Sequence, residues 1–182
     1  MNTAISLLLA IALLLVGASA DASPPYVRVE TNLGAFTLEL DPGHAPITVA
    51  NFLRYLDEGF YKDTLFHRSV KSSAFSVVQG GGFVRTTFPG SKNTEPAPKT
   101  THSPIVNESK NGLSNVRGTV GIARVAALNS ATSQFYVNTA DNTGFDYNPA
   151  LNSPGYAVFG KVIEGMATLD AINALQPASN LP

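Results

Sequence analysis

The chain has 182 residues, of which 44% are hydrophobic and 14% charged, with 12 Lys and Arg against 13 Asp and Glu. This composition suits one well-filled core and excludes a disordered chain, and a net charge of -1 gives no field that would attract nucleic acid or an anionic membrane. Cysteine is absent, which excludes disulfides, thiolate catalysis and cysteine-ligated zinc. Without an apolar leader, roughly 160 residues remain, which predicts a single domain.

The leader is an apolar run at residues 5–16, followed by the small residues Gly17 to Ala20. The run is too short to cross a hydrocarbon core of about 30 Å and ends in an A-x-A pattern, which is typical of a cleaved secretory signal. We expect residues 1–20 to be a signal peptide, cleaved after Ala20 or Ala22, although residues 1–3 carry no Lys or Arg. The mature protein is then periplasmic or secreted and free of the membrane, and an uncleaved anchor is the alternative.

The mature chain opens with two alternating segments, 26–31 and 35–40, around Asn32-Leu33-Gly34, which predict a β-hairpin. Pro46 stands where a first-turn proline belongs, and apolar residues recur at helical spacing until Gly59, which predicts an amphipathic helix.

Short β-type runs broken by Gly, Asn, Ser and Pro follow, and the clearest are 76–79, 118–123, 134–139 and 157–162. The polar, proline-bearing segment 86–110 predicts a long loop, and residues 166–175 predict a second helix after Gly165. Many short strands with only two helices favour a closed barrel or a sandwich.

Six short segments stand out in order along the chain. They are Phe66-His67-Arg68, Gln79 to Phe83, Asn107 to Leu113, Arg117-Gly118-Thr119, Ser133 to Tyr136, and Tyr156 to Val162. Together they resemble the cyclophilin-type peptidyl-prolyl isomerases from about residue 26 to residue 175, and the part between Gly118 and Val162 is similar to the periplasmic bacterial branch. We therefore expect an isomerase domain at 26–176 and a short tail at 177–182.

The resemblance implies a mainly β fold: a closed antiparallel eight-stranded barrel capped by two helices, with a shallow outer groove for an X-Pro segment. It also implies that Arg68 is catalytic and that Gln79 and Gln134 position it and the substrate backbone. Rotation about an X-Pro bond must break amide resonance, a barrier of about 18–20 kcal/mol. An arginine suits the task because it is always charged and carries several fixed donors, so no nucleophile, metal or cofactor is required.

The residues that the resemblance places against the substrate share an aromatic or apolar character. They are Phe66, His67, Phe75, Val77, Tyr136, Phe145 and Tyr156. We expect Tyr136 to form the floor under the proline ring and Tyr156 to form a wall, with plain core packing as the alternative for Tyr136. His67 is expected to support Arg68, since this rearrangement needs no proton shuttle. Gly80 to Gly82 are expected to allow close backbone approach beside the groove.

The sequence departs from the family pattern at three places. Ten residues, 69–78, separate Arg68 from Gln79, more than in relatives, so either Phe75 or Ser76 occupies a pocket position, and we favour Phe75. Gly144 stands where relatives carry a larger aromatic residue, which implies weak cyclosporin binding. Relatives close the barrel with a last strand after the second helix, whereas 176–182 is short and ends in proline. The sequence is then truncated or the barrel stays open, with its first strand as an exposed edge.

These observations favour a peptidyl-prolyl cis-trans isomerase that acts on X-Pro bonds of unfolded or exported proteins. The alternative is a catalytically weak module that binds proline-containing segments on the same fold. We expect a monomer with no nucleic-acid partner. We also expect no metal site, since the histidines are scattered and have no spaced second ligand.

Overall fold

The computed structural model describes residues 23–87 and 94–175. The predicted signal peptide and its cleavage site lie outside the described residues, and so does the tail that was expected to lack a closing strand. Within the described ranges, no helix combines the length and the apolar character that a membrane span requires.

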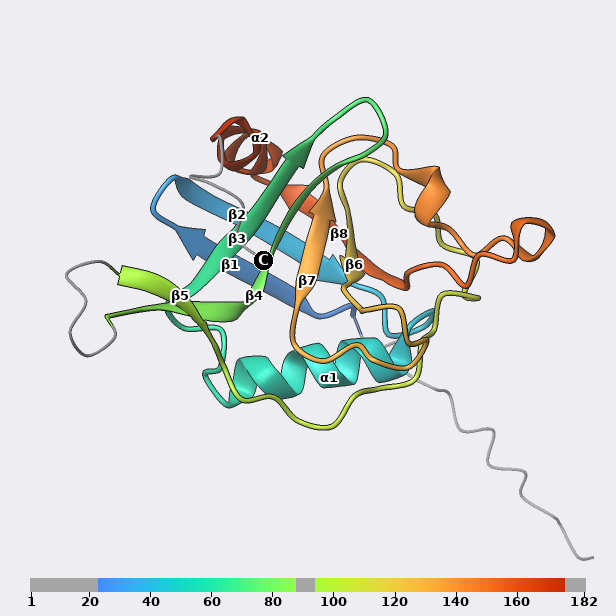
Figure 1. Ribbon diagram of the computed structural model, residues 1–182, viewed down its shortest axis with the longest axis horizontal. Coiled ribbons are helices and arrows are strands. Elements are labelled where there is room, and N and C mark those ends of the chain that lie inside the picture. Colours follow the sequence, from blue (N-terminus) through green and yellow to red (C-terminus); the bar gives the residue numbers. More distant parts are fainter. Residues whose placement is uncertain (1–22, 88–93, 176–182) are drawn as a thin grey trace, which may run out of the picture.

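Strands dominate the described chain and form one curled antiparallel sheet (Figure 1). They are β1 (Tyr26–Thr31), β2 (Gly34–Leu40), β3 (Thr64–Lys71), β4 (Ser76–Thr87), β5 (Thr94–Pro98), β6 (Thr119–Ile122), β7 (Phe135–Asn138) and β8 (Val158–Glu164). Neighbours run in the order β1-β2-β8-β6-β7-β4-β3, and β5 pairs with β4. β4, in the middle of the chain, therefore pairs with the distant strand β7 as well as with its sequence neighbours β3 and β5.

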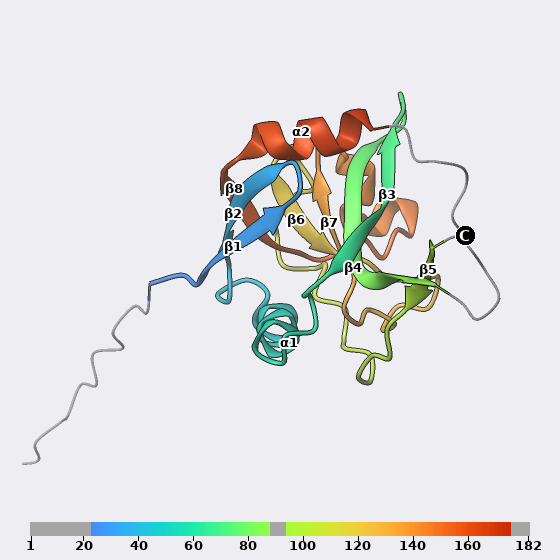
Figure 2. The same ribbon diagram turned by 90° about the vertical axis from the view of Figure 1, so that its left-hand side faces the viewer.

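Two α-helices cover opposite ends of the curled sheet, α1 (Pro46–Asp57) and α2 (Met166–Ala174) (Figures 1 and 2). Helix α1 begins at the predicted proline, and its first backbone N–H groups donate to a carboxylate from a distant loop: Ile47 N and Thr48 N lie 3.0 and 2.7 Å from Glu108. A negative charge at this end also complements the helix dipole. Both predicted helices and the predicted hairpin are therefore confirmed.

The core lies between the inner face of the sheet and α1, and aromatic rings fill much of it. Phe52 on α1 packs edge-on against Phe135 of β7, with centroids 5.4 Å apart, and against Phe159 of β8 at 5.3 Å. Such offset and edge contacts are the favoured aromatic geometries. The core thus holds the central strands rigidly, so that side chains on their outer faces have fixed positions.

The two ends of the sheet, β1 and β3, do not pair with each other within the described residues. A cavity of about 600 Å³ lies between them and reaches the core rings of Phe52 and Phe135. The sheet therefore curls as expected for the barrel, and a gap separates its two end strands, β1 and β3.

The segment predicted as one long loop, 86–110, contains part of a strand pair, so that prediction is wrong in its first half. β4 continues to Thr87, and β5 runs back along it, with Arg85 opposite Pro96 and Phe83 opposite Pro98. Proline has no N–H to donate, which confines it to edge strands, and β5 is such an edge. The prolines that suggested a loop therefore mark the outer strand of a two-stranded extension.

Candidate active site

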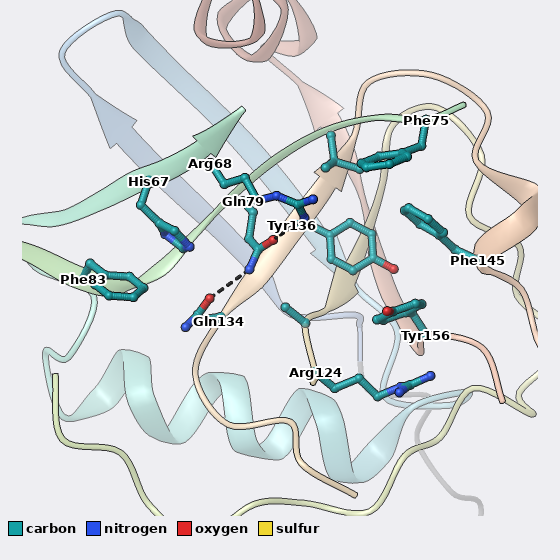
Figure 3. Close-up of a pocket in the computed structure, with 12 residues that line it drawn as sticks. His67, Arg68, Phe75, Gln79, Phe83, Arg124, Gln134, Tyr136, Phe145 and Tyr156 are labelled. Carbon is teal, nitrogen blue, oxygen red and sulfur yellow. Dashed lines mark hydrogen bonds between the residues drawn. The ribbon is translucent and has the colours of Figure 1, made fainter. Parts of the chain in front are cut away.

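A pocket of about 440 Å³ opens on the outer face of the sheet, where β3, β4 and β7 lie side by side (Figure 3). It is lined by His67, Arg68, Phe75, Val77, Gln79, Phe83, Ala123, Arg124, Gln134, Tyr136, Phe145 and Tyr156. The fold therefore brings together all the predicted site residues except Phe66.

Phe66, by contrast, does not line this pocket. Its half-buried ring packs against the core, 6.2 Å from the Phe36 ring and 6.0 Å from the Phe135 ring, measured between centroids. The pairing of β3 with β4 shifts register on both sides of Phe66. In a regular strand adjacent side chains alternate between faces. Here the irregularity lets His67 and Arg68 both line the pocket while Phe66 packs inward and does not line it.

Three polar side chains form a hydrogen-bonded row along one side of the pocket (Figure 3). Arg68 Nη1 donates to Gln79 Oε1 at 3.3 Å, and Gln79 Nε2 donates to Gln134 Oε1 at 2.9 Å. Because Gln79 Oε1 accepts from the arginine, the Gln79 amide nitrogen must face Gln134 Oε1. The two bonds therefore fix the orientations of the Gln79 and Gln134 amides. Arg68 is exposed and keeps most of its five N–H donors for other partners.

A glycine of β4 makes room for the last member of this row. A Cβ atom built on Gly82 would lie 2.5 Å from Gln134 Cγ, well inside van der Waals contact. The missing side chain at Gly82 therefore admits the Gln134 side chain, and at Gly80 a Cβ atom would lie 3.0 Å from the Leu65 carbonyl oxygen.

Four aromatic rings form the other side of the pocket. Phe75 and Tyr156 each lie 5.4 Å from Phe145 between centroids, and Tyr136 meets Phe145 at 83°. Phe75, rather than Ser76, occupies the pocket position. Ser76 is buried instead, with its hydroxyl 2.7 Å from Thr139 Oγ1. The extra residues between Arg68 and Gln79 are thus accommodated at the β3–β4 turn, and the ring is kept.

Hydrogen bonds inside the protein hold Tyr136 in place, in addition to its contacts with the neighbouring rings. Its hydroxyl donates to Asn115 Oδ1 at 2.6 Å, and Asn115 Nδ2 donates to Asp146 at 2.9 Å. Gly121 lies against the hydroxyl, and a Cβ there would collide with it. Burial raises the pKa of Tyr136 well above its usual value, so the hydroxyl stays protonated and remains a donor. Tyr136 therefore presents its ring to the pocket and directs its hydroxyl into the protein.

His67 lies at the far end of the pocket, with its ring 4.5 Å from that of Phe83. Burial lowers the pKa of His67 below its ordinary value, so the ring is neutral at pH 7. It adds no second positive charge beside Arg68. This placement agrees with a supporting rather than a proton-transferring side chain.

Sequence reasoning missed three lining residues: Phe83, Ala123 and Arg124. Phe83 follows Gln79 at an even spacing along β4, so the alternation of a strand could have found it. Ala123 and Arg124 come just after β6 and carry no local signal. No three potential metal ligands of the His, Asp or Glu type gather anywhere in 23–87 or 94–175. The four rings of Phe75, Tyr136, Phe145 and Tyr156 form an aromatic cup. N–H donors lie next to this cup, an arrangement that can bind a carbonyl and a compact apolar ring together.

Comparisons with known proteins agree with this geometry. The family model described as cyclophilin type peptidyl-prolyl cis-trans isomerase/CLD matches residues 26–181. The chain is 40% identical over 170 residues to peptidyl-prolyl cis-trans isomerase A of Dickeya dadantii (strain 3937), which covers 91% of this chain and 82% of that protein. It is 41% identical over 150 residues to peptidyl-prolyl cis-trans isomerase B of Escherichia coli (strain K12), covering 82% and 84%.

A solved structure gives the same result for the fold. The crystal structure of a Cryptosporidium parvum cyclophilin type peptidyl-prolyl cis-trans isomerase, determined in the presence of the dipeptide Ala-Pro, matches with a TM-score of 0.59 and 28% identity. The match covers 82% of this chain and 85% of that chain. The order of strands, the arginine–glutamine row and these matches together show that the chain belongs to the cyclophilin-type peptidyl-prolyl cis-trans isomerase family.

Proposed function

We propose that the protein accelerates cis–trans rotation about X-Pro peptide bonds in unfolded or exported polypeptides. The observation that carries the proposal is the row of Arg68, Gln79 and Gln134 beside the aromatic cup. Polar donors and an apolar recess lie within one pocket, as the two halves of an X-Pro unit require.

The aromatic cup suits the prolyl ring. A proline side chain is compact and apolar and has no backbone N–H, so it can enter a recess without leaving a donor unpaired. Tyr136 forms the floor of this recess, while Phe75 and Phe145 lie to one side of it as walls (Figure 3). The bound ring would be held while the preceding carbonyl turns.

The polar row suits the transition state. When the amide twists, resonance is lost and the prolyl nitrogen gains electron density, so a donor directed at it is more favourable in the transition state than in the ground state. Arg68 supplies such a donor, and its bond to Gln79 holds the guanidinium at the edge of the cup. A hundred-thousand-fold acceleration would require about 7 kcal/mol of this differential stabilisation.

The alternative, a weakly active module that only binds proline-containing segments, would have been favoured by loss of the pocket at the insertion. Phe75 nevertheless lines the cup, and Gln79 still bonds Arg68. These contacts support the enzyme over the binder.

Cellular context is also part of the proposal. We propose export to the periplasm or cell exterior, which the apolar leader at 5–16 supports, and action as a monomer without a membrane attachment. Weak binding of cyclosporin is supported by Gly144, which offers no side chain beside Phe145.

The test is a proline-isomerisation assay on a short X-Pro peptide with the mature protein and its Arg68→Ala variant. We expect kcat/KM to fall at least about 100-fold, the usual loss when one transition-state donor is removed. Arg85→Ala is a matched control, since Arg85 is exposed on the same β4 strand but lies outside the pocket. No acceleration by the folded wild type would leave only the binder, and equal rates in both proteins would show that Arg68 has another role.

A further inference from the structure

Arg124 is a pocket residue that the isomerase mechanism does not use. Its Nε and Nη2 atoms donate to the Gly155 carbonyl at 3.1 and 2.8 Å, and its Nη1 atom donates to the Val125 carbonyl at 2.9 Å. The guanidinium carbon lies 4.4 Å from the centroid of the Tyr156 ring. These contacts hold the side chain in one position, so a ligand that meets it does not have to order it.

All of these partners are neutral, so the positive charge of Arg124 is not balanced. Arg117 and Arg54, by contrast, pair with Asp170 and Glu58 on other surfaces. Among the described residues, no carboxylate lies within 4.0 Å of Arg124 or of Arg68. An arginine that lines a pocket without a counter-charge attracts anionic ligands.

The pocket lining as a whole is positively charged. Its lining includes two guanidinium groups and no Asp or Glu. Asp146, a carboxylate next to the lining residue Phe145, does not line the pocket and accepts hydrogen bonds from Ser114 Oγ and Asn115 Nδ2. Arg68 and Arg124 lie on opposite sides of the Tyr136 ring (Figure 3). A prolyl ring over Tyr136 would therefore lie between two cations.

We propose that Arg124 makes this pocket selective for X-Pro segments in which a residue next to the proline is acidic. The inference rests on the proposed isomerase function, since it assumes that the proline occupies the aromatic cup. Arg68 is occupied with the prolyl peptide itself, and Arg124 beyond Tyr156 is placed to meet the side chain of a neighbouring residue. The pair is partly exposed, so a preference of about fivefold is expected, the size of a solvated ion pair.

The test compares peptides that differ in charge alone. Blocked tetrapeptides carry Glu, Gln or Lys directly before proline in one set and directly after it in a second set. For each, kcat/KM is measured in the assay above, and the affinity is measured by calorimetry, with wild type, Arg124→Gln, Arg124→Lys and the control Arg85→Gln. Ratios within one protein are compared, so a general change of activity in a variant cancels.

We expect wild type and Arg85→Gln to favour Glu over Gln about fivefold in one set, with Lys poorest, and the ratio to shrink at about 0.5 M salt. Arg124→Gln should abolish the ratio, and Arg124→Lys should keep part of it. Equal values for Glu and Gln in wild type would overturn the proposal, and an unchanged ratio in Arg124→Gln would overturn the role of Arg124. Absent catalysis with selective binding would refute the isomerase and leave the charge selectivity standing.

Discussion

Hydrogen-bonded amide side chains form a row in the pocket and another inside the fold, both within the residues that the structure describes. In the pocket, Gln79 and Gln134 are half-buried and continue the row that begins at Arg68. Inside, Asn115, Asn138 and Asn142 are at most 3% exposed and are linked to each other directly.

The difference between the rows is the number of donors left over. Asn138 Nδ2 donates to Asn115 Oδ1 and to Thr119 Oγ1, and Asn142 Nδ2 donates to Asn138 Oδ1 and to the Ser76 carbonyl, so the inner row is saturated. The pocket row ends in Arg68, whose exposed guanidinium retains free donors. Buried amides that are fully paired stabilise one arrangement of loops, whereas the same chemistry at the surface remains available for a ligand. The following predictions test that division.

The largest expected effect is on stability, from Asn142→Ala. The Asn142 side chain accepts from the N–H of Ser76 at 2.9 Å and donates to its C=O at 2.8 Å, at the first residue of β4. Its loss leaves the buried Ser76 N–H and Asn138 Oδ1 unpaired, so the free energy of unfolding should fall by about 3 kcal/mol in urea denaturation. Where the variant is folded, kcat/KM should stay within about threefold of wild type. A larger loss of activity would show that the inner row is part of the catalytic apparatus.

Next comes Gln79→Leu, the matching change in the pocket row. It removes the acceptor for Arg68 and the donor to Gln134 with little change in volume. We expect kcat/KM to fall about thirtyfold, equal to about 2 kcal/mol, because Arg68 is no longer held at the cup. The free energy of unfolding should change by less than about 1 kcal/mol, since the Gln79 amide is half-buried. If the stability fell as far as in Asn142→Ala, the two rows would not differ in role.

A smaller effect is expected from Gly82→Ala. The added methyl would lie 2.5 Å from Gln134 Cγ, so Gln134 must move away from Gln79. We expect a fall of about fivefold in kcat/KM, measured with an X-Pro peptide, while the Arg68–Gln79 bond remains. Gly144→Ala is the matched control, because a methyl group there meets nothing within 4 Å. Full activity of the Gly82 variant would mean that the position of Gln134 does not matter.

The smallest effect concerns pH. Burial lowers the pKa of His67, so its ring stays neutral and kcat/KM should be level between about pH 6.5 and 8. In the unfolded chain His67 takes up a proton near pH 6.5, whereas in the folded protein it does so only at lower pH. The free energy of unfolding therefore falls as the pH drops below about 6.5, until the pKa of the folded state is reached. His67→Phe should reduce this slope when urea denaturation is compared from pH 7.5 to about pH 5. An identical slope would assign the pH dependence to other groups.

The sequence predicted the pocket better than it predicted the strands that build it. The resemblance of short motifs to a known family singles out Arg68, Gln79 and Gln134, and the structure brings them together. Phe66 lies outside the pocket because the irregular pairing of β3 changes which neighbouring residues share a face, and no local sequence pattern indicates such a bulge. β5 was missed for a related reason, since prolines usually indicate loops and only the partner strand shows that they lie on an edge.

By itself the sequence determined the hairpin, both helices and the family, because alternation, helical spacing and ordered motifs are properties of neighbouring residues. Only the tertiary structure decided which residues meet across the pocket. Arg124 comes from the end of β6 and reaches Gly155 and Tyr156, some thirty positions later, and Gly121 leaves room for the Tyr136 hydroxyl on the adjacent strand. Contacts of this kind depend on strand register and on the curl of the sheet, which packing sets over the whole domain.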